Sequence, residues 1–266
     1  MGAAEFERDG SLVTVVLDGQ GQSAVDLDDP ARLEFEYVQH LALCVDALTS
    51  PGPLRVTHVG GAGLTLPRWV HHTRPGSPQI VLEPDEALTD AVRRELPLPR
   101  GHRIRVRAVD GASGVAAIKD DSADLVVVDA YAGGRVPADL VTGAWFGDVA
   151  RVLAPGGVLL ANLADEPGMR HVARVLAGAR EALGHVALVG LHEVLKGRRF
   201  GNLVLVASES PIALYDLRRA AASAALPTGV MTGDEVARKV PGARPFTPQD
   251  AQPSPVPPER GAWRRR

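Results

Sequence analysis

Short apolar runs alternate with stretches of helical spacing along most of the chain. The apolar runs predict five strands, over Leu54–Val59, Ile80–Leu82, Ile104–Val109, Asp124–Val128 and Val158–Leu163. Between and after them, apolar residues recur with a helical period, which predicts connecting helices ending near Glu95, Ile118, Leu153 and Leu183. Strands joined by helices form a parallel sheet covered on both faces, so the pattern predicts a doubly wound, Rossmann-like α/β fold.

Both ends of this region show a different pattern. Ser11–Leu17 and Gln22–Leu27 are extended runs separated by a glycine-containing turn, which predicts a small N-terminal β-hairpin, and a helix is expected over Leu33–Leu48. Near the other end, His185–Val194 and Asn202–Ser208 are extended runs with no helix between them. Such neighbours are most simply antiparallel, so we expect an antiparallel C-terminal strand pair.

These patterns divide the chain into three parts. Residues 1–50 would hold the hairpin and the lead-in helix, and residues 51–226 the Rossmann-like nucleoside-binding domain. Residues 227–266 are rich in proline, glycine and arginine, and we expect them to form a disordered tail.

Composition excludes several classes of protein. The formal net charge of −3 over 266 residues gives no general attraction to nucleic acid or to anionic membranes. The single cysteine, Cys44, lies in an apolar helical stretch, which predicts a buried thiol, and no cysteine or histidine spacing suits a metal. We also find no export signal and no apolar run of about 18 residues, so a cytoplasmic protein that does not span membranes is expected.

The candidate chemistry lies where the predicted strands end. The first strand runs into Gly60-Gly61-Ala62-Gly63, a turn whose backbone a ligand can approach closely. Carboxylates follow the next three strands, at Glu83, Asp110 and Asp129. Ligands of open parallel sheets bind at the carboxyl ends of the strands. Glu83 stands twenty residues after Gly63, where an acidic side chain can accept hydrogen bonds from ribose hydroxyls.

The turn also distinguishes between nucleotides. A dinucleotide site needs G-x-G-x-x-G, and the third glycine is missing from its position here. A mononucleoside without a pyrophosphate, such as S-adenosylmethionine, therefore fits better than NAD, although an NAD-dependent oxidoreductase remains a weaker interpretation. No G-K-[ST] follows the glycines, which excludes a P-loop.

In these residues the chain resembles the spermidine-synthase-like (polyamine aminopropyltransferase) branch of the class I S-adenosylmethionine-dependent methyltransferase superfamily. The resemblance covers roughly Val13 to Ser208. Its motifs are Leu17-Asp18-Gly19-x-x-Gln22, Val59-Gly60-Gly61-Ala62-Gly63, Leu82-Glu83-x-Asp85, Asp110-Gly111, Val127-Val128-Asp129 and Pro155-Gly156-Gly157-Val158.

The resemblance implies a class I methyltransferase type of sheet and a role for each matching residue. Gln22 would contact the amino-acid-like end of S-adenosylmethionine or its decarboxylated form, and Glu83 its ribose. Asp110 and Gly111 would border the adenine, and Pro137 the thioether pocket. Asp129 would be the catalytic carboxylate, orienting the attacking amine and accepting its proton. The ligand would lie over Gly60, Gly61 and Gly63.

The implied reaction transfers an aminopropyl or a methyl group to a small-molecule amine, as in polyamine biosynthesis, and the resemblance also implies a homodimer. Tyr131 is a candidate supporting donor, whereas His40 is expected on a helix surface.

The chain also departs from the family pattern. Gly63 stands where the synthases carry an aspartate, and Ala132 replaces the second carboxylate of Asp-x-x-Asp after Asp129. The family's Y-x-E motif matches Glu34-Phe35-Glu36, in which Glu36 is kept and Glu34 takes the tyrosine position, and this offers Glu34 or Glu36 as substitute carboxylates. These departures motivate an alternative, a non-catalytic nucleoside-binding or interaction protein on the same fold.

Overall fold

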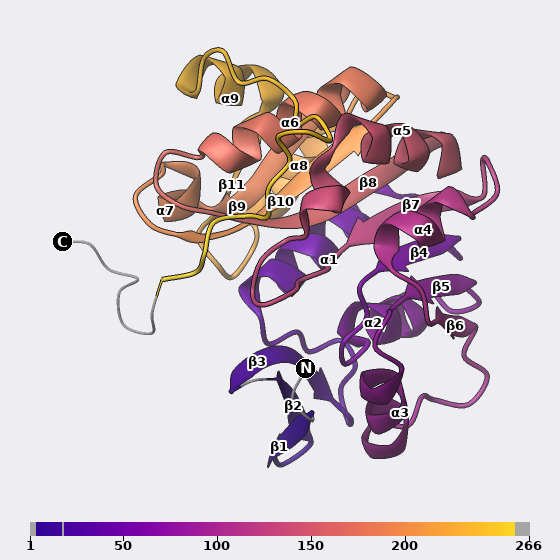
Figure 1. Ribbon diagram of the computed structural model, residues 1–266. Coiled ribbons are helices and arrows are strands. Elements are labelled where there is room, and N and C mark those ends of the chain that lie inside the picture. Colours follow the sequence, from indigo (N-terminus) through magenta and orange to yellow (C-terminus); the bar gives the residue numbers. More distant parts are fainter. Residues whose placement is uncertain (1–3, 18, 259–266) are drawn as a thin grey trace.

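The computed structural model describes residues 4–17 and 19–258, and a mixed sheet of eight strands forms the centre of this described part (Figure 1). Five strands are parallel: β4 (Val56–Val59), β5 (Gln79–Leu82), β6 (Ile104–Arg107), β7 (Ala123–Val128) and β8 (Leu153–Asp165). The remaining three pair in antiparallel fashion: β9 (His185–Leu191), β10 (Gly201–Ser208) and β11 (Thr228–Thr232). The spatial order is β11-β9-β10-β8-β7-β4-β5-β6, which confirms the doubly wound sheet with an antiparallel end.

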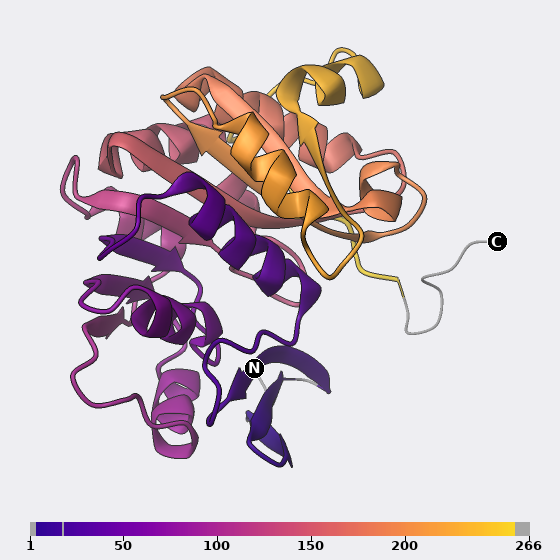
Figure 2. The same ribbon diagram turned by 180° about the vertical axis from the view of Figure 1, so that it is seen from behind.

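Helices cover both faces of this sheet (Figures 1 and 2). One core contains residues of α4 (Gly111–Ala116), η1 (Ala138–Val141), α5 (Gly143–Val152), α6 (Arg170–Leu183) and α9 (Gly233–Lys239). The opposite core contains α1 (Glu36–Leu48), α2 (Thr65–Thr73) and α8 (Leu214–Ala222). Strand β7 is apolar at successive positions because both of its faces are buried. Val126 and Val128 lie in the first core, and Leu125 and Val127 lie in the second. The remaining helices are α3 (Glu86–Glu95) and the single turn α7 (His192–Leu195).

The N-terminal unit is a three-stranded sheet rather than a hairpin. Strands β2 (Leu12–Leu17) and β3 (Gln20–Asp26) form the predicted hairpin, and β1 (Glu5–Asp9) adds an edge strand. This sheet buries Val13, Val15 and Val25 in a third core that includes residues of α3. A hydrogen bond of 2.9 Å from the Thr65 hydroxyl to the Ala24 carbonyl ties β3 to α2. Asp18, part of the leader motif, lies outside the described residues.

Helix α1, which the sequence grouped with the hairpin in residues 1–50, packs on the large sheet instead. Its Leu41 and Val45 are buried in the same core as Leu160 of β8 and Val204 of β10. Cys44 is fully buried, as expected. His40, expected on the helix surface, is also buried, and its Nε2 lies 3.0 Å from the Thr228 hydroxyl of β11.

The expectation of a disordered tail from residue 227 is wrong for the described part of that segment. Residues 228–239 form β11 and α9, and Thr232 caps α9 with a capping box that includes Glu235. Further on, Phe246 and Ser254 are buried, with 1% and 0% of their surfaces exposed. Tertiary contacts therefore order a segment whose composition alone suggests disorder. The arginine-rich end, residues 259–266, lies outside the described residues.

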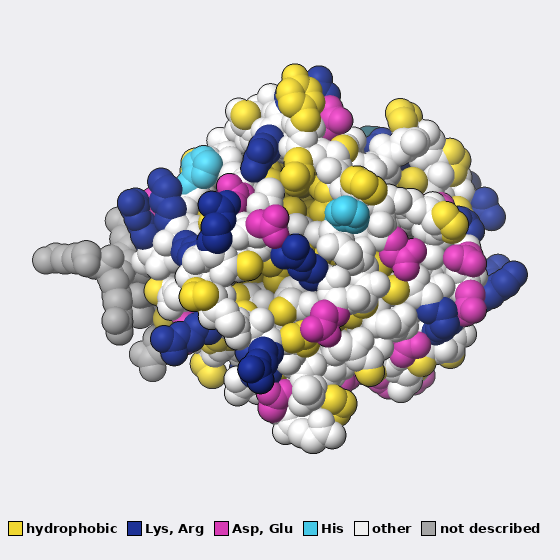
Figure 3. Space-filling model, turned by 90° about the horizontal axis from the view of Figure 1, so that it is seen from above, with side chains coloured by type: hydrophobic (Ala, Val, Ile, Leu, Met, Phe, Trp, Pro, Cys, Tyr) yellow, Lys and Arg dark blue, Asp and Glu magenta, His cyan; other side chains and the backbone are white. Residues whose placement is uncertain are grey.

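Across the described residues, no helix combines the length and the apolar character needed to cross a bilayer. Figure 3 views the molecule from above, and on this face acidic and basic side chains are interspersed, with hydrophobic side chains between them. A surface of mixed charge offers no continuous field of one sign for a polyanion.

Candidate active site

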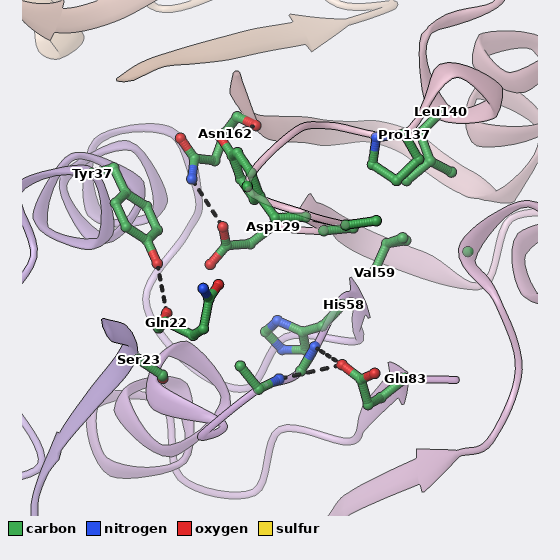
Figure 4. Close-up of a pocket in the computed structure, with 18 of the residues that line it drawn as sticks. Gln22, Ser23, Tyr37, His58, Val59, Glu83, Asp129, Pro137, Leu140 and Asn162 are labelled. Carbon is green, nitrogen blue, oxygen red and sulfur yellow. Dashed lines mark hydrogen bonds between the residues drawn. The ribbon is translucent and has the colours of Figure 1, made fainter. Parts of the chain in front are cut away.

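A cavity of about 680 Å³ opens at the carboxyl ends of β4, β5 and β7, beneath the N-terminal sheet. It is lined by every site residue that the sequence predicted except Gly63, namely Gln22, Gly60, Gly61, Glu83, Asp110, Gly111, Asp129 and Pro137. Figure 4 shows how labelled side chains from β3, α1 and the strand ends converge on it. The topology therefore brings together residues that are far apart in the sequence.

The glycine turn after β4 is closely packed against the Asp129 backbone. Gly60 has a φ of +91°, and a Cβ added there would lie 2.2 Å from the Asp129 carbonyl oxygen. Its amide donates to the Leu82 carbonyl at 2.9 Å, which holds the turn against the end of β5. Two non-glycine residues of the turn region, Ala62 and Leu64, also have positive φ values, of 37° and 59°. The backbone conformation is thus strained and specific, as at many ligand-binding turns.

Glu83 accepts three backbone hydrogen bonds, two of which fix it to this turn. Its Oε2 accepts from the amides of Gly61 and Ala62, at 3.0 and 3.3 Å (Figure 4). Its Oε1 accepts from the amide of Asp85 at 3.1 Å. Each carboxylate oxygen has two lone pairs, so Oε1 can accept a further bond from the cavity. The geometry suits an acceptor for ribose hydroxyls.

Gly63 points away from the cavity. A Cβ there would lie 2.7 Å from the Ser23 hydroxyl and 3.1 Å from a Val15 methyl group. The expectation that Gly63 contacts the ligand is therefore not supported, because the residue packs against the N-terminal sheet. An aspartate at this position would have to displace the side chains of Ser23 and Val15.

Asp129 lies at the end of β7, and its carboxylate faces the cavity. The Asn162 side-chain amide donates to its Oδ1 at 2.9 Å, and Figure 4 shows the two side chains pointing toward each other. Burial raises the pKa of Asp129 to about 6, and hydrogen bonds from Asn162 and Tyr37 limit the rise. A carboxylate with such a pKa is ionised at neutral pH and is a better base than an ordinary aspartate.

Behind Asp129 lies a network of neutral polar side chains that the sequence analysis mostly missed. The Asn202 amide donates to Asn162 Oδ1 at 2.9 Å and to the Tyr131 hydroxyl at 3.2 Å. The Tyr37 hydroxyl lies 3.4 Å from the Gln22 carbonyl and also faces Asp129, and its single proton can be donated to one of these two acceptors at a time. Burial raises the pKa values of Tyr37 and Tyr131 above the usual range, so both phenols stay neutral.

The structure corrects the expectation for the Y-x-E motif. Glu34 and Glu36 do not line the cavity; Glu34 lies 3.4 Å from Arg32 and Glu36 lies 3.7 Å from Arg199. Tyr37, the residue directly after Glu36, does line it, so a tyrosine rather than either glutamate faces the site.

The opposite end of the cavity is formed by the start of α4 and by η1. Asp110 caps α4, accepting from the Ser113 amide at 2.8 Å, and these hydrogen bonds lower its pKa. A Cβ on Gly111 would lie 2.4 Å from a Val59 methyl group and 3.1 Å from Leu140. Pro137, at the start of η1, lines the same end. Val59, Pro137 and Leu140 give this end apolar surface on which an aromatic base could pack.

The charge of the cavity wall has one sign. Among the described residues that line it, four carry carboxylates, namely Glu83, Asp110, Asp129 and Asp139, and none is lysine or arginine. A wall of this kind attracts a cation, such as a sulfonium or an ammonium group.

The C-terminal segment borders the mouth of the cavity. Pro257 and Pro258 line it, and Ser254 pairs with Val136 through a 3.1 Å bond from its amide and a 2.9 Å bond to its hydroxyl. The Arg135 guanidinium donates to the carbonyls of Pro253, at 3.0 Å, and of Ser254. These contacts anchor the loop after Asp129 to the segment that the sequence predicted to be disordered.

The sequence and the structure were compared with those of known proteins. No protein-family model matches the sequence. A curated relative, the polyamine aminopropyltransferase of Chromobacterium violaceum, is 26% identical over 164 residues, covering 61% of this chain, and the chain spans 62% of that relative's length.

Solved structures give broader coverage. A probable spermidine synthase from Corynebacterium glutamicum is 29% identical, with a TM-score of 0.84 and coverage of 92% of both chains. Human methyltransferase-like protein 13, solved in complex with SAH, has a TM-score of 0.57 at 19% identity, covering 81% of this chain and 96% of its own, and this likeness concerns the fold alone. The chain is therefore similar in sequence and fold to polyamine aminopropyltransferases and spermidine synthases, on a class I methyltransferase type of sheet.

Proposed function

We propose that this spermidine-synthase-like chain binds S-adenosylmethionine or its decarboxylated form and transfers an aminopropyl or a methyl group to an amine. One observation carries the proposal: the turn-bound Glu83 and the half-buried Asp129 line the same acidic cavity. Glu83 would accept from the ribose, Asp110 and Gly111 would border the base, and Gln22 would contact the amino-acid-like end. The resemblance to enzymes named as transferases favours catalysis over a non-catalytic nucleoside-binding role.

The side chains of the site would position the acceptor amine and supply the base that accepts its proton. Asp129 would orient the amine of the acceptor and accept its proton as the nitrogen bonds to the carbon beside the sulfonium. Asn162 and Tyr37 would hold the carboxylate in place. The departing sulfur becomes a neutral thioether and takes no proton, so the site needs a base but no acid.

The charge of the lining favours the decarboxylated donor, and hence aminopropyl transfer. The carboxylate of S-adenosylmethionine would enter a cavity whose described lining has four acidic side chains and no basic one. The decarboxylated form carries only an ammonium group at that end and avoids this repulsion. A direct comparison of the two dissociation constants tests this preference.

Methylthioadenosine, the thioether product of aminopropyl transfer, is expected to stabilise the protein against heat. At 100 times its dissociation constant it would add about 2.7 kcal/mol to the free energy of unfolding. For a chain of this size that corresponds to a rise in Tm of roughly 5–10 °C. Differential scanning fluorimetry with methylthioadenosine, both forms of S-adenosylmethionine and NAD measures it.

A matched pair of variants locates the binding site. Glu83→Gln, which weakens the proposed ribose contact, should reduce the shift, whereas Glu86→Gln on the exposed start of α3 should not. A chain that no sulfonium or thioether nucleoside stabilises would refute the proposal.

The affinity for a sulfonium nucleoside should fall at acidic pH. The pKa of Asp129 is about 6, so below pH 6 the free protein holds a proton that binding of the cation must displace. The dissociation constant should then rise by up to about tenfold per pH unit below 6 and stay level above it. Calorimetry from pH 5 to pH 8 measures this, with neutral methylthioadenosine as the reference. An identical pH dependence for both ligands would contradict the prediction.

The proposal extends to cytoplasmic location and to a homodimer. Cell fractionation and analytical ultracentrifugation test these two points.

A further inference from the structure

We infer that the amine acceptor carries a single ammonium-forming nitrogen and an uncharged far end, so that monoamines and amino alcohols are preferred over diamines. This inference rests on the proposed function, because it concerns the acceptor of the same site. It follows from the groups that surround Asp129.

The wall around Asp129 is polar but neutral. Tyr37, Tyr131, Asn162 and Asn202 line the cavity there, and their hydroxyl and amide groups are linked by hydrogen bonds to one another or to the backbone. Such groups can bind a hydroxyl or leave an alkyl chain in contact with the tyrosine rings. They cannot neutralise a second ammonium group.

The other carboxylates of the cavity lie at the end proposed for the nucleoside. Glu83 accepts three backbone hydrogen bonds, two from the glycine turn and one from the Asp85 amide. Asp110 caps α4, and Asp139 lies in η1 beside Leu140, which packs close to Gly111. Asp129 itself is the base for the attacking nitrogen. A diamine would therefore bring its second charge to a region without a matching carboxylate.

Two arginines directly adjoin residues of this wall in the sequence. Arg135 follows the lining residue Gly134, and its guanidinium is bound by carbonyls of the C-terminal segment. Arg199 precedes the lining residue Phe200 and lies 3.7 Å from Glu36, so the charge of that glutamate is already balanced. Placing an ammonium group here would desolvate it without a counter-ion, which is unfavourable. Ala132, also on the wall, supplies no charge.

Three acceptors of equal chain length test the inference: 4-aminobutan-1-ol, butylamine and putrescine, each with decarboxylated S-adenosylmethionine as donor. We expect kcat/KM for the amino alcohol to exceed that for putrescine by roughly tenfold or more, because the polar wall can pair with a hydroxyl but not with an ammonium group. A preference for putrescine, or no transfer to any of the three while the donor binds, would overturn the inference. Failure of donor binding would instead overturn the proposed function.

A gain-of-function pair makes the test sharper. Ala132→Asp places a carboxylate on the wall three positions after Asp129, and Ala132→Asn places a neutral group of the same shape there. The aspartate variant should raise kcat/KM for putrescine relative to 4-aminobutan-1-ol by roughly tenfold, and the asparagine variant should leave the ratio unchanged. Equal effects of both variants, or none, would show that charge on this wall does not select the acceptor.

Discussion

Asp129→Asn is expected to lower the rate of alkyl transfer by about 10²- to 10⁴-fold, the range typical of a lost general base. The substituted amide keeps the shape of the side chain and an oxygen that Asn162 can still bond. Binding of methylthioadenosine should change little, since this ligand has neither a sulfonium charge nor an attacking amine. Single-turnover rates, measured at saturating donor and acceptor, isolate the chemical step.

The same substitution should make the protein more stable at pH 8. Burial raises the pKa of Asp129 from 3.8 to about 6, so above pH 6 the folded state contains a carboxylate that would be easier to ionise when unfolded. Removing that charge should raise the free energy of unfolding by about 1–3 kcal/mol, a range that allows for contact of the group with water in the cavity. The gain should shrink as the pH falls from about 6 and vanish below about pH 3, where both states are protonated.

The rate and the stability of Asp129→Asn together distinguish a catalytic role of this carboxylate from a structural one. A purely structural carboxylate would lose stability and keep its rate, whereas the proposed base loses rate and gains stability. Asp90→Asn, on the exposed side of α3, is the control for the change in net charge. If Asp129→Asn turned over at the wild-type rate, Asp129 would not be the catalytic base.

Much of the sheet could be predicted because its central strands carry the strongest local signal. Strand β7 is buried on both faces and is therefore continuously apolar, so it could be located within a residue or two. Strand β1 has the sequence EFERD and is mostly exposed at an edge, so neither apolar runs nor alternation reveal it. The average composition of residues 227–266 predicts disorder and gives no indication of β11 and α9. A local signal for the helix start is nevertheless present, in the capping box of Thr232 and Glu235.

The site could be predicted only where it depends on strand ends. Glu83, Asp110 and Asp129 follow strands of one parallel sheet, so topology alone brings them to one edge. Asn162 lies near the end of β8 and Asn202 at the start of β10, beside apolar runs that look like core, and no local motif marks them. Gly63 was assigned to the ligand because the sequence does not show that β3 packs against it.

Gly60→Ala is expected to damage stability and function together. At a φ of +91°, an L-residue is strained by about 1–3 kcal/mol before any contact is considered. The new Cβ would also lie 2.2 Å from the Asp129 carbonyl oxygen and 3.0 Å from the Ala130 Cα, both of which are backbone atoms. Relief of that overlap requires the turn to move away from the end of β7, which displaces the base from the donor.

A substitution at a second glycine, Gly101, distinguishes the cost of backbone strain from the cost of displacing the turn. Gly101 also has a positive φ, of +76°, but a Cβ there would meet nothing within 4 Å, so Gly101→Ala carries the conformational cost alone. We expect Gly60→Ala to lose a further 1–3 kcal/mol or so beyond Gly101→Ala in chemical denaturation, the usual cost of overpacking. It should also lose most binding of methylthioadenosine, while Gly101→Ala binds normally. Equal losses of stability with binding retained in both variants would mean that the turn is not coupled to Asp129, and that the close approach of these two backbones is not what shapes the site.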